Sequence, residues 1–195
     1  MSFYTGKGDG GTTKLFDSKP GERVTKTSPI FECLGMLDEL NALTGWCKTE
    51  ARKQKTENRK QAELLVVNGR AMDELLRDVQ DHLFTIQAEV AGAPKSVPQT
   101  SVEHLGELIN AIERSLPPVT TFLVPGGTEL SARLDIARAV SRRAERRLVH
   151  LVENGEREVS PSSRAYANRL SSLFYALTRL ANHALEIEES PPAYK

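Results

Sequence analysis

Four charged side chains lie along one face of a long predicted helix in the second half of the sequence. Asp135, Arg138, Arg142 and Glu145 follow one another at spacings of three, four and three residues, and at about 100° per residue these positions share one side of a helix. Arg138 and Arg142 stand one turn apart, where like charges repel by about 0.2–0.5 kcal/mol. Because a guanidinium group binds phosphate oxygens in a fixed fork geometry, the pair predicts a polyphosphate site.

The same stretch has an apolar face, so the helix must pack against a core with its charged face directed elsewhere. It follows the turn Pro125–Gly127, with Thr128 as the predicted N-cap, and runs without Gly or Pro to Gly155. The alternative interpretation is a solvated face with ion pairs inside the helix. The predicted core residues are Leu134, Ala137, Val140, Ala144, Leu148 and Leu151.

A glycine-rich stretch near the N-terminus is a second candidate for anion binding. Residues 4–14 contain four Gly, three Thr and two Lys, and backbone amides beside Gly can approach an anion closely. Arg23 and Lys26 follow in a second basic stretch. No Gly-Lys-Ser/Thr opens a following helix, so this is not a Walker A loop. On composition alone a flexible terminus is the favoured alternative.

The elements that position these residues are predicted to be helices, with no strands. The hydrophobic periodicity predicts helices over about 30–51, 61–91, 101–115 and 128–155, and a last helix opened by Ser160 and Pro161. Ser101 is the predicted N-cap of the third, and residues 51–60 are predicted to be a solvated helix end or loop. This is the pattern of an all-α, up-down, five-helix bundle. We expect one domain over 1–195, with an N-terminal segment (1–29), a bundle (30–188) and a tail (189–195).

Composition limits the classes of partner and compartment. The chain has 26 basic and 26 acidic residues, so no overall charge recruits nucleic acid or a membrane surface. Cys33 and Cys47 are 14 residues apart on one predicted helix, about 21 Å along its axis, and cannot bond to each other. Two unpaired cysteines, no signal peptide and no long apolar run lead us to expect a cytoplasmic protein. No zinc-type cluster and no catalytic triad stands out.

Six short motifs, in this order and spacing, carry a resemblance to a known family. They are Thr5–Gly11, Arg23–Lys26, Gly35–Asn41, Phe122–Gly127, Arg138–Arg146 and Asn168–Ser171. Over nearly its whole length the chain resembles the PduO-type ATP:cob(I)alamin adenosyltransferases. The resemblance implies a five-helix bundle of ferritin-like type that assembles as a homotrimer, with active sites between subunits.

The resemblance also implies a nucleotide site beneath a mobile N-terminal segment. ATP would arrive with Mg²⁺ held by its phosphates, with no dedicated protein ligands for the metal. The residues implied to contact the nucleotide are Thr5, Gly6, Lys7, Gly8, Asp9, Thr13, Lys14, Lys26, Arg142, Arg143, Glu145, Arg146 and Asn168.

Four residues are implied to carry the reaction: Arg142, Phe122, Arg138 and Asp38. Phe122 matches the family's aromatic residue on the lower face of the corrin, where it displaces the lower ligand of cobalt. Asp38 would pair with Arg138 across the subunit interface. One departure from the family's pattern is Asp135, where many relatives carry His. This difference bears on corrinoid affinity more than on ATP binding.

The implied reaction transfers the 5′-deoxyadenosyl group of ATP to the cobalt of cob(I)alamin, giving adenosylcobalamin and triphosphate. Expected partners are an electron-donating reductase and, as a further candidate, an adenosylcobalamin-dependent client enzyme. Neither nucleic acid nor a membrane is expected. Two other hypotheses stay open: a trimeric ATP or corrinoid carrier or sensor without turnover, and a helical interaction module whose stretch Arg142–Arg147 binds nucleic acid or a protein.

Overall fold

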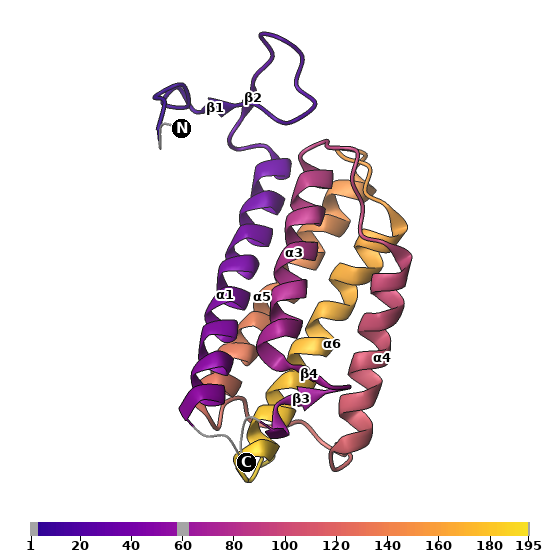
Figure 1. Cartoon of the computed structure of the whole chain (residues 1–195). Coiled ribbons are helices and arrows are strands. Elements are labelled where there is room, and N and C mark those ends of the chain that lie inside the picture. Colours follow the sequence, from indigo (N-terminus) through magenta and orange to yellow (C-terminus); the bar gives the residue numbers. More distant parts are fainter. Residues whose placement is uncertain (1–3, 58–62, 195) are drawn as a thin grey trace.

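A computed structural model describes residues 4–57 and 63–194 and has five long helices in that part of the chain (Figure 1). The predicted all-α, five-helix bundle is confirmed. The expectation of no strands is wrong in detail, because two short antiparallel ribbons occur: β1 (Thr12–Thr13) with β2 (Val24–Thr25), and β3 (Val66–Val67) with β4 (Arg70–Ala71). The helices are α1 (Pro29–Glu57), α3 (Met72–Val90), α4 (Gln99–Ser115), α5 (Glu129–Glu153) and α6 (Pro161–Ala184).

The helices alternate in direction, which sets the two ends of the bundle. Helix α1 packs against α3 and α5, and α6 packs against α5 and α4. Glu39 of α1 pairs with Arg143 of α5, and Glu50, eleven residues on, pairs with Arg133, ten residues back. The helices α1 and α5 are therefore antiparallel, so α1 begins at the end of the bundle where α5 finishes (Figure 1).

Local capping explains where the last two helices begin. Thr128 Oγ1 accepts a hydrogen bond from the backbone N–H of Ser131 at 2.9 Å, and Ser131 Oγ accepts one from the N–H of Thr128 at 2.7 Å. This reciprocal pair satisfies amides that have no partner inside the helix. Ser160 caps α6 by accepting from the N–H of Ser163, with Pro161 in the first turn. The cap predicted at Thr128 is confirmed, as is the start of the last helix at Ser160 and Pro161.

The helix predicted over 61–91 is wrong in its first part. The chain forms the β3–β4 ribbon before α3 begins at Met72, while residues 58–62 lie outside the described part. Asn68 and Gly69 have φ of 50° and 76°, the two positive values that a tight hairpin turn requires. The Asn-Gly pair is the sequence signal for this turn, and it outweighs the helical spacing of the leucines around it.

Two further helix boundaries differ from expectation. Helix α1 continues to Glu57, through most of the polar stretch predicted to end it. Helix α4 begins at Gln99 after Pro98, with no side-chain cap. The predicted capping role of Ser101 is therefore wrong, because this residue lies inside the helix, where its hydroxyl is 3.0 Å from Nε2 of His82.

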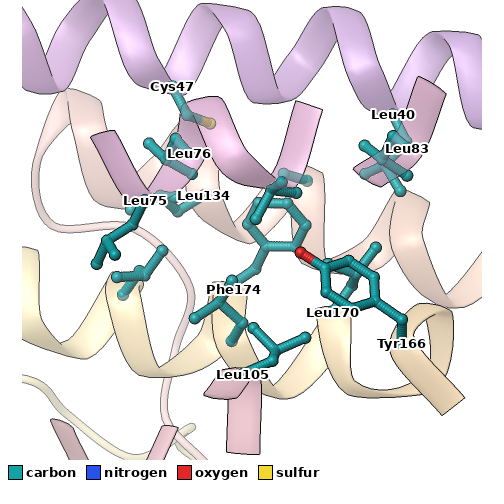
Figure 2. Packing of buried hydrophobic residues seen from close by; sticks show 14 of the residues in the cluster. Leu40, Cys47, Leu75, Leu76, Leu83, Leu105, Leu134, Tyr166, Leu170 and Phe174 are labelled. Carbon is teal, nitrogen blue, oxygen red and sulfur yellow. The ribbon is translucent and has the colours of Figure 1, made fainter. Parts of the chain in front are cut away.

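The core lies between the helices and contains Phe174 of α6, which is fully buried among leucines of α1, α3 and α5 (Figure 2). All six residues predicted for the apolar face of α5 are buried, with exposed fractions of 6% or less. Cys33 and Cys47 are free thiols with no exposed surface, and burial raises the pKa of each to about 12. The prediction that they form no disulfide with each other is confirmed. Within the described residues, no helix combines the length and hydropathy needed to cross a bilayer.

Candidate active site

The N-terminal residues 4–28 form a separate layer beyond the end of the bundle where α1 begins (Figure 1). Arg23 organises this layer. Its Nε donates to Thr12 Oγ1 at 2.8 Å, and its Nη2 donates to the carbonyl oxygens of Lys7 and Thr12, each at 2.6 Å. One guanidinium group therefore ties the glycine-rich stretch to β2. The sequence analysis placed Arg23 in a basic motif but gave it no role of its own.

Glycine is required where the stretch turns. Gly6 and Gly11 have φ of 68° and 74°, in the left-handed region that favours glycine. At Gly8 an added Cβ would lie 3.1 Å from Nζ of Lys26, so the ammonium group of Lys26 lies against this backbone. Of the other residues predicted here, Thr5, Lys7, Asp9 and Lys14 are exposed and Thr13 is half-buried. The ribbon thus places the ammonium group of Lys26 beside the backbone of the glycine-rich stretch.

A hydrogen bond and an ion pair between an exposed Asp17 and a half-buried Arg157 attach this layer to the bundle. The N–H of Phe16 donates to the carbonyl of Ala91 at 2.9 Å, just after α3, and Arg157 Nη1 lies 2.5 Å from Asp17 Oδ2, just after α5. These hydrogen bonds to Arg157 hold the pKa of Asp17 below its ordinary value. The carboxyl group also lies directly against Gly92, at φ 94°, where any Cβ would overlap it. The ribbon is therefore fixed to the end of the bundle where α3 and α5 finish.

The half of α5 that leads to this end carries guanidinium groups without carboxylate partners. Arg143 is paired with Glu39 at 2.9 Å. Arg142 and Arg146 are exposed, and within the described part of the chain neither meets a carboxylate; Arg146 Nη1 donates instead to the backbone carbonyl of Arg142 at 3.2 Å. Arg147 likewise has no carboxylate partner among the described residues. This part of α5 therefore has positive charge that no carboxylate of the described chain neutralises.

Glu145 and Asn168 connect α5 to α6 beside these arginines. Asn168 Nδ2 donates to Glu145 Oε1 at 2.5 Å, which fixes both side chains at the helix junction. Two residues that the sequence analysis assigned to the same nucleotide site, 23 positions apart in the chain, are thus in direct contact.

Asp38 and Arg138 do not meet within one chain. Asp38 is exposed and forms no hydrogen bond or ion pair with the rest of the described chain. Its neighbour Glu39 faces Arg143, five residues beyond Arg138 on α5. Arg138 Nε lies 3.3 Å from Asp135 Oδ1. The predicted pairing of Asp38 with Arg138 was placed between subunits, and it stays a prediction.

Phe122 lies far from the N-terminal ribbon. It is 79% exposed, in the connection between α4 and α5, at the end of the bundle opposite the ribbon (Figure 1). The 25 residues of α5 separate the two ends by about 37 Å at 1.5 Å per residue. One chain alone therefore does not bring Phe122 to the ribbon.

Asp135 has a structural role that the sequence did not reveal. Its Oδ2 accepts from the backbone N–H of Gly126 at 2.9 Å, and the residue is only 9% exposed. It therefore holds the turn that follows Phe122 to α5, rather than belonging to the open part of the charged face. Among residues 4–57 and 63–194, no three His, Cys, Asp or Glu side chains come together as a metal site.

The chain is similar to proteins of one kind over most of its length. A family model described as cobalamin adenosyltransferase matches residues 3–181. The chain is 39% identical over 187 residues to the corrinoid adenosyltransferase PduO of Salmonella typhimurium, covering 92% of this chain and 49% of that protein. It is 37% identical over 190 residues to PduO of Citrobacter freundii, covering 94% and 50%. The chain thus spans about half the length of these two relatives.

Shorter relatives and solved structures match from end to end. The corrinoid adenosyltransferase of Bacillus subtilis is 32% identical over 187 residues, covering 93% of this chain and 87% of that protein. A variant PduO-type ATP:corrinoid adenosyltransferase from Lactobacillus reuteri, complexed with cobalamin and ATP, superposes with a TM-score of 0.81 at 26% identity, covering 99% of this chain and 100% of that one. By the extent of the family match and of these relatives, the chain belongs to the cobalamin adenosyltransferase family.

Proposed function

We propose that this protein transfers the 5′-deoxyadenosyl group of ATP to the cobalt of cob(I)alamin, giving adenosylcobalamin and triphosphate. Membership of the family and relatives named corrinoid adenosyltransferases support this reaction. The observation that carries it is the pair Arg142 and Arg146: exposed guanidinium groups without carboxylate partners in the described chain, on the half of α5 that leads to the glycine-rich ribbon. An anion with many oxygens fits such a surface.

The chemistry needs charge neutralisation and orientation more than it needs a base. Reduced cobalt supplies the electron pair that forms the bond to C5′ of ATP. The C5′–O bond breaks, and triphosphate leaves with the two electrons of that C5′–O bond. No proton is removed, so a catalytic triad is unnecessary. Mg²⁺ bound to the phosphates would neutralise part of the leaving charge, and Arg142 would stabilise the charge that develops as triphosphate departs.

The N-terminal layer would enclose the nucleotide. Its positive φ values and the position of Lys26 over Gly8 give backbone and ammonium donors of the kind that bind phosphate. We propose that residues 1–29 act as an ATP-binding segment of a single domain that orders on nucleotide. The proposed contacts are Thr5, Gly6, Lys7, Gly8, Asp9, Thr13, Lys14 and Lys26, with Arg142, Arg143, Glu145, Arg146 and Asn168 from the bundle.

The corrinoid would bind where two copies of the chain meet. Phe122 and the ribbon lie at opposite ends of one bundle (Figure 1), so a site using both requires a second copy. This supports sites between subunits. On the family resemblance we propose that the assembly is a homotrimer, in which Phe122 faces the lower side of the corrin. A separate reductase would supply the electron, and a client enzyme would take the product.

An anaerobic assay tests the reaction. Cob(I)alamin and ATP-Mg are mixed with the full chain, and the loss of the Co(I) absorbance is followed. We expect ATP-dependent formation of a light-sensitive alkylcobalamin. If the protein binds ATP and corrinoid but no alkylcobalamin forms, the adenosyltransferase proposal is wrong and a carrier or sensor takes its place.

Removing the Arg23 guanidinium should weaken ATP binding while the bundle stays intact. In Arg23→Ala the hydrogen bonds to Thr12 and Lys7 are lost, so the glycine-rich stretch is less ordered before the nucleotide binds. We expect the KM for ATP to rise about 10-fold, as charge-assisted hydrogen bonds are worth roughly 1.5–3 kcal/mol. Lys19→Ala removes an exposed charge from the same layer and is the control. An equal rise in KM for both variants would refute a specific role for Arg23.

A double-mutant cycle tests the pair between subunits. In Asp38→Asn and in Arg138→Met, we expect the trimer to dissociate at roughly 10-fold higher concentration, with little further loss in the double variant, because contacting residues are not additive. Analytical ultracentrifugation measures this. Glu39→Gln, which breaks a pair within one chain, should leave assembly unchanged. Additive effects of the two single changes would show that Asp38 and Arg138 do not touch.

A further inference from the structure

The connection that carries Phe122 packs into the core at Leu116, and beyond that residue it is held mainly by hydrogen bonds. Most of residues 117–128, between α4 and α5, are exposed. A cavity of about 360 Å³ separates part of this connection from the end of α6 and the C-terminal tail, and its wall includes Val119, Leu123, His183 and Ile187. Because side chains do not fill this space, the position of the connection depends on a few polar contacts.

Those contacts come from the end of α6 and from the tail. Arg179 Nη2 donates to the carbonyl of Pro117 at 3.2 Å, at the start of the connection. Asn182 Nδ2 donates to the carbonyl of Gly126 at 3.0 Å, near its end. Between them, the backbone N–H of Val124 donates to the carbonyl of Ser190 at 2.9 Å. Phe122 therefore lies between residues whose backbone is hydrogen-bonded, with Pro117 before it and Val124 and Gly126 after it.

Glu189 links the two side chains that make these contacts. Its Oε2 accepts from Arg179 Nε at 2.6 Å, and its Oε1 accepts from Asn182 Nδ2 at 3.1 Å. The side chains of Arg179 and Glu189 are 12% and 17% exposed, and Asn182 is 2% exposed. A charged pair so shielded from water is costly to break, because its remaining partner is left buried without a counter-charge.

The end of the connection requires glycine at position 127. Gly127 has φ 127°, and an added Cβ would lie 2.6 Å from Asn182 Oδ1. Asp135 holds the N–H of Gly126 from α5 while Asn182 holds its carbonyl from α6. Gly126, four residues after Phe122, is thus hydrogen-bonded to side chains of two helices.

We infer that Arg179, Asn182 and Glu189 are positioning residues that set where Phe122 stands, and that the C-terminal tail is thereby part of the corrinoid site without touching the corrin. This inference rests on the proposed function. In this arrangement two parts of the chain have different roles: the ribbon and α5 bind ATP, whereas the tail holds Phe122 in place at the other end of the bundle. A small displacement of a positioned group can cost a large factor in rate.

The test compares Glu189→Ala with Glu188→Ala in the full chain. Glu188 is the adjacent exposed acid, and it forms no hydrogen bond or ion pair with the described residues, so it controls for charge and for tail composition. Three quantities are measured for each variant: amide hydrogen exchange of peptides covering 117–127, the Kd for ATP, and the rate of adenosyl transfer. Glu189→Gln, which keeps one acceptor oxygen, measures rescue.

We expect Glu189→Ala to raise exchange in 117–127 about 10-fold, to slow adenosyl transfer about 10-fold, and to leave the Kd for ATP within twofold of the original. Glu188→Ala should change none of these, and Glu189→Gln should recover part of the loss. Unchanged exchange would overturn the inference, as would faster exchange with an unaltered rate of transfer. If the unmodified protein transfers no adenosyl group, the proposed function fails instead, and the exchange data still decide whether the tail fixes the connection.

Discussion

Arg142→Ala is expected to lower kcat/KM for ATP by about 10²–10³-fold, the range seen when one donor to developing charge is removed. The side chain is exposed, lies on the half of α5 that leads to the N-terminal ribbon, and has no carboxylate partner in the described chain. Nothing in the fold therefore depends on its charge, and the unfolding temperature should stay the same. The loss should fall mainly on kcat, because charge on triphosphate grows as the C5′–O bond breaks.

Arg147→Ala is the matched control for Arg142. It removes the same exposed group from the same helix, five residues later, about 140° around the axis. Steady-state kinetics of both variants, with cob(I)alamin in excess, separate a positioned charge from a general positive field. An equal loss of kcat/KM in both variants would mean that the overall positive charge of α5, rather than the position of Arg142, causes the effect. Unaltered kinetics in Arg142→Ala would show that Arg142 does not belong to the triphosphate site.

Phe122→Ala is expected to slow adenosyl transfer from cob(II)alamin and a reductant by about 10²-fold, while the Kd for ATP changes less than twofold. The ring is 79% exposed, so it contributes little to the stability of the free chain, and its apolar surface is available to a ligand. If Phe122 displaces the lower ligand of cobalt, its removal leaves that donor bound and keeps the cobalt hard to reduce.

The spectrum of bound cob(II)alamin gives the direct measurement for Phe122. With ATP present, the original protein should form four-coordinate cob(II)alamin, detectable by electron paramagnetic resonance, and Phe122→Ala should form much less. Phe84→Ala, which truncates another exposed aromatic residue, on α3, is the control. Identical cobalt spectra in Phe122→Ala and the original protein would contradict the proposed role.

Long periodic patterns predicted the fold well. The apolar face of α5 repeats over five turns, and all of its predicted core residues are buried. The ribbon at 66–71 was missed because its signal is two residues, Asn68 and Gly69, inside a run of leucines and valines that also fits a helix. A tight turn is signalled by only two residues, whereas the apolar face of a helix is signalled by a pattern that repeats over many residues.

The site was harder to predict, because its parts are joined by contacts between backbone and side chain. That Arg23 donates to the carbonyl of Lys7, or Asp135 accepts from the N–H of Gly126, cannot be inferred from residue types, since the backbone partner has no sequence signature. The contact of Glu145 with Asn168 agrees with their joint assignment to one site. In the proposed assembly, Asp38 and Phe122 would meet the other site residues through a second chain, and the residue types of one chain do not specify that arrangement.

The two buried thiols provide a probe of helix α1 that requires no mutation. Cys33 and Cys47 are the protein's full set of cysteines, and with a pKa of about 12 only about one thiol in 10⁴ would be ionised at pH 8. A disulfide reagent can therefore modify either sulfur only when part of α1 separates from the bundle. The two labelling rates, resolved by peptide mass, would report separately on the end of α1 that adjoins the N-terminal layer and on the middle of α1. If added ATP slows the labelling of Cys33 but not of Cys47, then ATP binding stabilises α1 at the end nearest the N-terminal layer.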